Sequence, residues 1–212
     1  MWAQGAQSTA VREFPEYKLI DGNLDTDGLP TSGAKLCVIG PSAPCFQMPS
    51  NAGYSGGGVT YDYGLDPHAE RLAVSGGRAF VLFSATFSGG GSGTLDSLSI
   101  LRYEAGGKIV NLLPFVGLTN QGEKAVWSIP GVSGFPILVT ADADWDIPKE
   151  THFARHFFEV SAYRFDPHQG VYARVLRYRT SKKYKSLDET DDIRVIEPER
   201  QEIMRRLTTA TR

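Results

Sequence analysis

The chain lacks a strong charge of either sign and lacks a long hydrophobic run. Its 212 residues carry 22 Lys and Arg against 24 Asp and Glu, which gives a formal net charge of −2. This balance provides no general attraction to nucleic acid or to an acidic membrane surface. No apolar run approaches the roughly 18 residues that cross a membrane. We therefore expect a globular protein with no nucleic-acid partner and no membrane span.

Familiar catalytic motifs are also missing. The Gly-rich run 88–94 has no phosphate-loop lysine, and Thr94 stands where the serine-hydrolase elbow needs glycine. His152 and His156 have the spacing of a zinc helix, but Phe153 replaces the glutamate that a metalloprotease needs. We therefore favour binding over catalysis. A pair of carboxylates that converge for glycoside hydrolysis remains an alternative.

Cys37 and Cys45 are the only two cysteines, and the segment between them contains two prolines and a glycine. Such a segment suits a tight turn, so we expect a disulfide, which the chain-entropy estimate values at roughly 2.5 kcal/mol. The alternative is two unpaired, buried thiols in a cytosolic protein.

The first residues, 1–7, are small and polar apart from Met1 and Trp2. They resemble the start of a mature secreted protein, so we expect a signal peptide to have been removed. Together with the expected disulfide, this predicts a periplasmic or secreted protein.

Most of the chain reads as β structure. From residue 70 onward, β-favouring runs are separated by Gly and Pro, at 71–74, 78–87, 95–103, 108–116, 124–129, 135–140, 152–165 and 171–180. These runs predict a mainly β fold built from antiparallel sheet. We expect a single domain with four parts: an extended arm over 1–33 with one strand at 17–20, a loop-rich segment over 34–64, a β core over 65–185 and a helical tail over 186–212.

The helical tail is predicted from its termini. Pro198 lies near the start, acidic residues fill the first turn and basic residues the last. Ile203, Met204 and Leu207 would attach this short helix to the β core.

Two predicted hairpins share a pattern in which an arginine, an aromatic residue and an acid precede a turn that ends in glycine. They occupy 101–110 and 163–172. The pattern is consistent with a duplicated hairpin or blade, and equally with coincidence.

Basic and aromatic residues alternate over 172–185. This mixture is found in nucleic-acid and anion sites, but it is more typical of a solvated strand that protects a sheet edge.

An acidic segment follows the run 135–140. Asp142, Asp144, Asp146 and Glu150 occupy its first, third, fifth and ninth positions, and Pro148 can offer a carbonyl at the seventh. Oxygen ligands at this spacing are typical of a calcium loop. The alternative is a solvated turn in which Asp side chains cap backbone amides.

The stretch 138–150, continued by 161–172, resembles the calcium-loop repeats called FG-GAP or VCBS. It is similar to their use in small periplasmic proteins related to lysozyme inhibitors, some of which act as immunity proteins. The resemblance implies a calcium-stabilised β fold and a loop that plugs the active site of a lysozyme-like hydrolase, with Ser92 and Gly93 as the candidate plug. Ile147 stands where the repeats usually have Gly, and Glu150 where they usually have Asp. A secreted carbohydrate-active hydrolase that uses the acidic residues is the alternative function.

Overall fold

The structure is a computed structural model that describes residues 14–50, 55–56, 59–60, 63–74, 78–88, 94–129, 133–145, 151, 154–185 and 194–209. It is mainly β, with antiparallel sheets and one helix near the C-terminal end. This confirms the predicted fold class. No helix in these residues is long and apolar enough to cross a membrane.

The first large sheet has five strands in the order β11-β10-β9-β8, and β12 pairs with the remaining length of β10. Its strands are β8 (Asp66–Val74), β9 (Arg78–Ser88), β10 (Thr94–Glu104), β11 (Lys108–Asn111) and β12 (Val116–Thr119). The predicted run 108–116 is divided between β11 and the start of β12. Pro114 lies in this gap, and proline has no amide to donate to a sheet.

The second large sheet has four consecutive strands in the order β13-β14-β15-β16. They are β13 (Glu123–Trp127), β14 (Ile137–Asp144), β15 (Phe157–Asp166) and β16 (Val171–Arg179). All three pairings are antiparallel. The strand predicted over 152–165 therefore begins later, at Phe157.

The N-terminal strands form a third, smaller sheet in the order β1-β4-β5. They are β1 (Tyr17–Ile20), β4 (Lys35–Val38) and β5 (Cys45–Gln47), accompanied by the two-stranded pairs β2 (Asn23–Leu24) with β3 (Pro30–Ser32) and β6 (Ser55–Gly56) with β7 (Val59–Thr60). The strand predicted at 17–20 is present, within this sheet. Arg71 of β8 also secures the segment, because its Nη1 donates to the Phe14 carbonyl at 2.6 Å.

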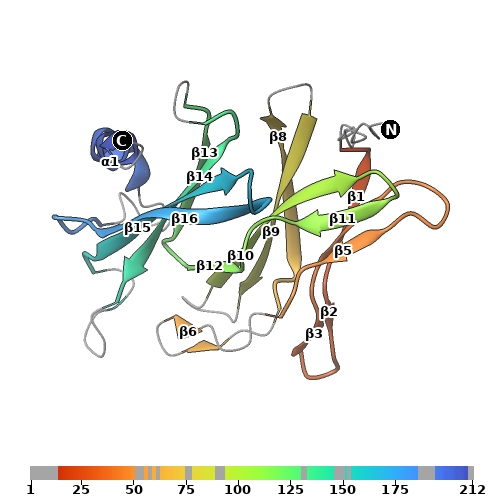
Figure 1. Cartoon of the computed structure of the whole chain (residues 1–212). Helices are drawn as coiled ribbons and strands as arrows, with labels where there is room; N and C mark the ends of the chain where they lie inside the picture. The colour runs from red at the N-terminus through yellow and green to blue at the C-terminus, as the bar shows by residue number, and fades with distance from the viewer. Residues whose placement is uncertain are drawn as a thin grey trace, which may run out of the picture.

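The sheets and the helix are stacked as layers (Figure 1). The two faces of β9 pack into different hydrophobic clusters. Phe80 faces the second sheet and Phe83 faces the N-terminal sheet, because side chains of a strand alternate between its two faces. Three buried clusters separate the layers, exemplified by Leu36, Met48 and Phe83; by Phe80, Ile100, Leu138 and Phe165; and by Val139, Val160 and Ile203.

Helix α1 (Ile196–Thr209) covers the outer face of the second sheet. Ile203 and Leu207 are buried there, as predicted, and Met204 is partly buried. Glu123 of β13 caps the helix, because its Oε2 accepts hydrogen bonds from the amides of Val195 at 2.6 Å and Ile196 at 2.7 Å. A carboxylate at a helix N-terminus also interacts favourably with the helix dipole.

The two hairpins that share a sequence pattern occupy equivalent places. β10–β11 forms the third and fourth strands of one consecutive meander, and β15–β16 forms the third and fourth strands of the other. The two meanders are thus arranged alike.

Candidate functional site

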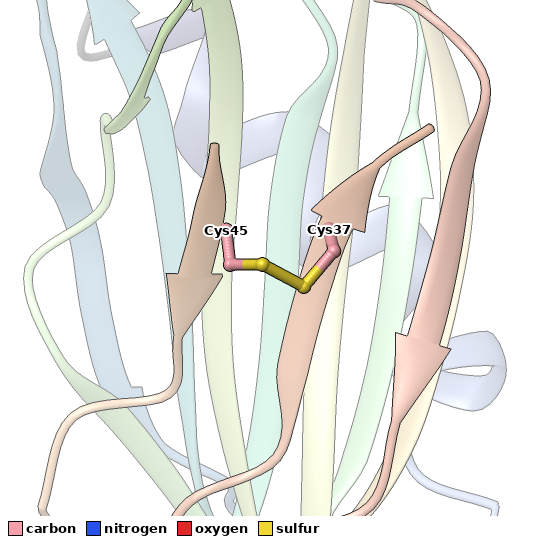
Figure 2. Close-up of a disulfide and its surroundings, with 2 residues drawn as sticks. All are labelled: Cys37 and Cys45. Atoms are coloured by element: carbon pink, nitrogen blue, oxygen red, sulfur yellow. A yellow bond between two sulfur atoms is a disulfide. The ribbon is translucent and has the colours of Figure 1, made fainter. Parts of the chain in front are cut away.

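Cys37 and Cys45 form the predicted disulfide, which links neighbouring positions of β4 and β5 (Figure 2). The two Cα atoms are 4.0 Å apart. Cys37 is buried against the N-terminal core and Cys45 is exposed. The bridge therefore closes a short loop at the edge of the molecule.

The first two acids of the predicted calcium loop lie in strand β14. The Oδ1 of Asp142 accepts hydrogen bonds from the Thr119 amide at 3.2 Å, the Thr119 hydroxyl at 2.7 Å and the Ala143 amide at 3.0 Å. The Oδ2 of Asp144 lies 2.6 Å from Nε of Arg179. Both carboxylates therefore already have protein donors.

Asp146, Pro148 and Glu150, the other predicted calcium ligands, lie outside the described residues, as do Ser92 and Gly93 of the predicted plug. Within the described residues, no group of three or more His, Cys, Asp or Glu side chains is placed to hold a metal ion. The calcium site stays a prediction.

His156 is a core side chain. It is fully buried, its ring lies 4.4 Å from that of Trp145, and its Nε2 donates to the Thr151 carbonyl at 2.9 Å. Trp145 in turn donates to the Thr119 hydroxyl at 3.3 Å. These contacts fix the end of β14 and so the position of Asp142.

Two arginines of the basic stretch, Arg177 and Arg179, are paired with acids on the same sheet. Arg177 pairs with Glu159 at 2.6 Å, and Arg179 pairs with Asp144. The hydrogen bond that Arg177 donates to Glu159 raises the pKa of Arg177 above its ordinary value. Arg179 also lies over the Phe157 ring, 4.2 Å from its centroid. This part of the stretch is therefore a paired strand face.

A second polar cluster lies between β16 and helix α1. The buried carboxylate of Glu199 accepts hydrogen bonds from the hydroxyls of Tyr178, at 3.0 Å, and Tyr184. Burial and this carboxylate raise the pKa of both tyrosines well above the ordinary value. Both phenols stay protonated and attach the helix to the sheet.

A polar cleft of about 200 Å³ separates β12 from the second sheet. We call it the interlayer cleft. It is lined by Phe115, Val116, Gly117, Leu118, Thr140, Asp142, Glu159, Ser161, Tyr163 and Arg174. Asp142 and Glu159 are direct cross-strand neighbours, as are Thr140 and Ser161. Tyr163 is paired with Arg174 of β16.

Several polar groups of the interlayer cleft are unused. Within the described residues, Arg174 has no hydrogen-bond or ion-pair partner, and the hydroxyls of Thr140, Ser161 and Tyr163 make no hydrogen bond. None of the three oxygens is a buried unsatisfied atom, so each is reachable by solvent. Unpaired polar groups that converge in a cavity are typical of a ligand site.

Sequence reasoning identified Asp142 but missed the rest of this cleft. The alternation of residues 159, 161 and 163 indicates that their side chains share one face of a strand. It does not indicate that β12 would cover that face, because the pairing of β12 with β10 fixes its position.

The β2–β3 hairpin extends beyond the neighbouring strands (Figure 1). Its two leucines are exposed, Leu24 at 52% and Leu29 at 61%. Asp25 orders the tip, because its Oδ1 accepts hydrogen bonds from the amides of Asp27 at 2.9 Å and Leu29 at 2.8 Å. Gly28 has a φ of 78°, which glycine adopts without strain.

Comparison with known proteins gives little guidance. No protein-family model matches the chain, and no curated protein matches it. One solved structure, described as the crystal structure of CarG, is similar at 17% identity and a TM-score of 0.40, covering 59% of this chain and 89% of that chain. A similarity at this level carries no argument about fold or function.

Proposed function

We propose that the protein is a periplasmic or secreted binding protein that presents its β2–β3 hairpin to a protein partner and performs no catalysis. The expected partner class is a lysozyme-like hydrolase, from the sequence resemblance. The observation that carries the proposal is the hairpin itself, in which two exposed leucines flank a tip ordered by Asp25. An ordered apolar tip loses little conformational entropy when it enters a cleft.

The compartment is supported by the disulfide between Cys37 and Cys45. Disulfides persist in oxidising compartments and are rare in the cytosol.

The partners of three acidic side chains support the absence of catalysis. Asp142, Asp144 and Glu159 each have protein donors at hydrogen-bond distance. A general acid is typically a carboxyl group in an apolar setting, whereas these three carboxylates are surrounded by polar and charged donors.

The hairpin is tested by measuring the affinity for a panel of lysozyme-class enzymes. Leu29→Asp should weaken binding about tenfold or more, with an unchanged melting temperature because the side chain is exposed. Ile39→Ser is the matched control, since Ile39 is 59% exposed but lies outside the hairpin. Equal affinities for wild type and Leu29→Asp, or no binding to any enzyme, would refute the proposal.

The predicted plug offers a parallel test. A variant that carries both Ser92→Ala and Gly93→Asp should lose inhibition if this tip contributes to the contact. Its effect is compared with that of Leu29→Asp in the same assay. If residues 92–93 form the plug, the double variant should bind more weakly than Leu29→Asp.

One observation favours the alternative function, a secreted hydrolase. Asp142 and Glu159 are cross-strand neighbours in a cleft, which places their Cβ atoms about 5 Å apart. Retaining glycosidases hold two carboxyl groups about 5–5.5 Å apart, an arrangement that side chains on neighbouring positions can reach. Release of sugar from a glycan panel by wild type, abolished in Glu159→Gln, would establish this function in place of binding alone.

Calcium binding by the acidic segment is a further part of the proposal. Its support is the spacing of Asp142 to Glu150, although a cation would have to displace or share the donors of Asp142 and Asp144. Calcium should raise the melting temperature of wild type over that in EDTA, and Asp144→Asn should reduce the increase. An unchanged midpoint in wild type would remove calcium from the proposal.

A further inference from the structure

We propose that the interlayer cleft is a binding site for a neutral sugar ring. This site is separate from the β2–β3 hairpin and does not depend on the partner proposed above. The inference combines four properties of the cleft: its charge balance, its unused hydrogen-bonding groups, its aromatic wall and its size.

The lining of the cleft carries charges of both signs. Two carboxylates, Asp142 and Glu159, are matched by two guanidinium groups, Arg174 in the lining and Arg177 in the ion pair with Glu159 at 2.6 Å. An anionic ligand would meet the carboxylates without a surplus of positive charge, and a cationic ligand would meet Arg174. The balance therefore favours a neutral ligand.

The hydrogen-bonding groups include both donors and acceptors. Arg174 donates, the hydroxyls of Thr140, Ser161 and Tyr163 do both, and Glu159 accepts. A sugar hydroxyl also donates and accepts, so a polyhydroxylated ring can satisfy these groups together. An apolar ligand would leave them unpaired, which is unfavourable.

The backbone of β12 supplies another donor. The Asn120 amide donates toward β10, to the Thr94 carbonyl at 2.7 Å, whereas the Thr119 amide points to Asp142 in the second sheet. Alternate residues of a strand direct their amides to the same side. The Gly117 amide therefore points toward the second sheet, as the Thr119 amide does.

Phe115 provides an aromatic wall. It lines the cleft and is 36% exposed. A Cβ atom at Gly117 would lie 3.3 Å from two Phe115 ring atoms, so glycine at this position lets the ring lie close to β12. An aromatic face beside polar groups suits a sugar, which has an apolar C–H face and a polar edge.

The cleft is small and its walls are fixed. Its volume of about 200 Å³ is below the roughly 300–1,000 Å³ of drug-sized pockets, which suits a single ring. Asp142 is held by Thr119, and Thr140, Ser161 and Tyr163 are buried strand residues. A site on strands needs little reorganisation to bind.

The test is ligand-observed NMR, followed by calorimetry, with glucose, galactose, mannose and N-acetylglucosamine as probes and glycine, lysine, glutamate and acetate as charged comparators. At least one sugar should bind in the millimolar range. Arg174→Gln should weaken its binding about tenfold or more, and Phe115→Ala should weaken it several-fold. Melting temperatures of all variants confirm folding.

Arg164→Gln is the matched control. Arg164 belongs to the same sheet and has no ion-pair partner among the residues that the structure describes, but it lines a separate hollow with Val175. Its replacement should therefore leave sugar binding unchanged. The proposal is overturned if no sugar binds, if a charged comparator binds in preference, or if Arg174→Gln and Arg164→Gln bind sugar equally. Leu29→Asp should leave sugar binding intact, which separates this outcome from failure of the proposed partner.

Discussion

The carboxylates of Asp142 and Asp144 have different partners although they are two residues apart in the same strand. Asp144 pairs with Arg179, and Asp142 accepts hydrogen bonds from Thr119 and Ala143. The sequence spacing alone favours a cation, because acids at alternate positions repel one another. Alternate spacing is also the period of a strand face, and only the fold shows that β12 and β16 provide these partners.

Thr119 should be a sensitive position. Its hydroxyl donates to Asp142 at 2.7 Å and accepts from Trp145 at 3.3 Å, and the residue is buried. Thr119→Val should lower the free energy of unfolding by about 1.5–3 kcal/mol, because a hydrogen bond to a charged group is lost. Urea denaturation measures the change.

The control for this position is Thr31→Val, since Thr31 is exposed and makes a weaker hydrogen bond of 3.2 Å to the Asn23 carbonyl. Its effect should remain within about 0.5 kcal/mol. Equal losses in the two variants would show that Thr119 does not hold Asp142.

Strands and helices could be predicted from the sequence where the local residue pattern determines them. The strand at 17–20 and the C-terminal helix are present, because their residues carry β propensity in one case and end-specific charges in the other. The interlayer cleft was not predictable, because it depends on β12 pairing with β10 while its other edge meets β14. Such long-range pairings leave no local signal in the sequence.

Helix α1 carries the charged group with the clearest pH dependence. Hydrogen bonds from Arg205 and then Arg206 lower the pKa of Glu202 from 4.5 to about 2. The folded state therefore favours ionised Glu202, so its contribution to stability is present above pH 4.5 and is lost as the pH falls toward about 2.

An NMR titration of the Glu202 carboxyl group tests this directly. The midpoint should lie well below 4.5 at low salt and should rise in high salt, because the pair is exposed and screened. A low-salt midpoint at the ordinary value would mean that Arg205 and Arg206 do not hold this side chain in solution.

The disulfide between Cys37 and Cys45 lies in the N-terminal sheet, at one end of the layered molecule. Its removal in a Cys37→Ala, Cys45→Ala variant should lower the free energy of unfolding by up to about 2.5 kcal/mol, because a short loop is released in the unfolded chain. Non-reducing mass spectrometry should show the wild type lighter than its reduced form by two hydrogens. Two freely alkylated thiols in protein taken from an oxidising compartment would contradict the disulfide and weaken the argument for export.

The central claim, binding without catalysis, is tested most directly by one assay of peptidoglycan cleavage. Product release is measured with the protein alone, and with each member of a panel of lysozyme-class enzymes at increasing protein concentration. We predict no release by the protein alone and stoichiometric inhibition of at least one enzyme. Release by the protein alone, or full activity of every enzyme at saturating protein, would contradict the account.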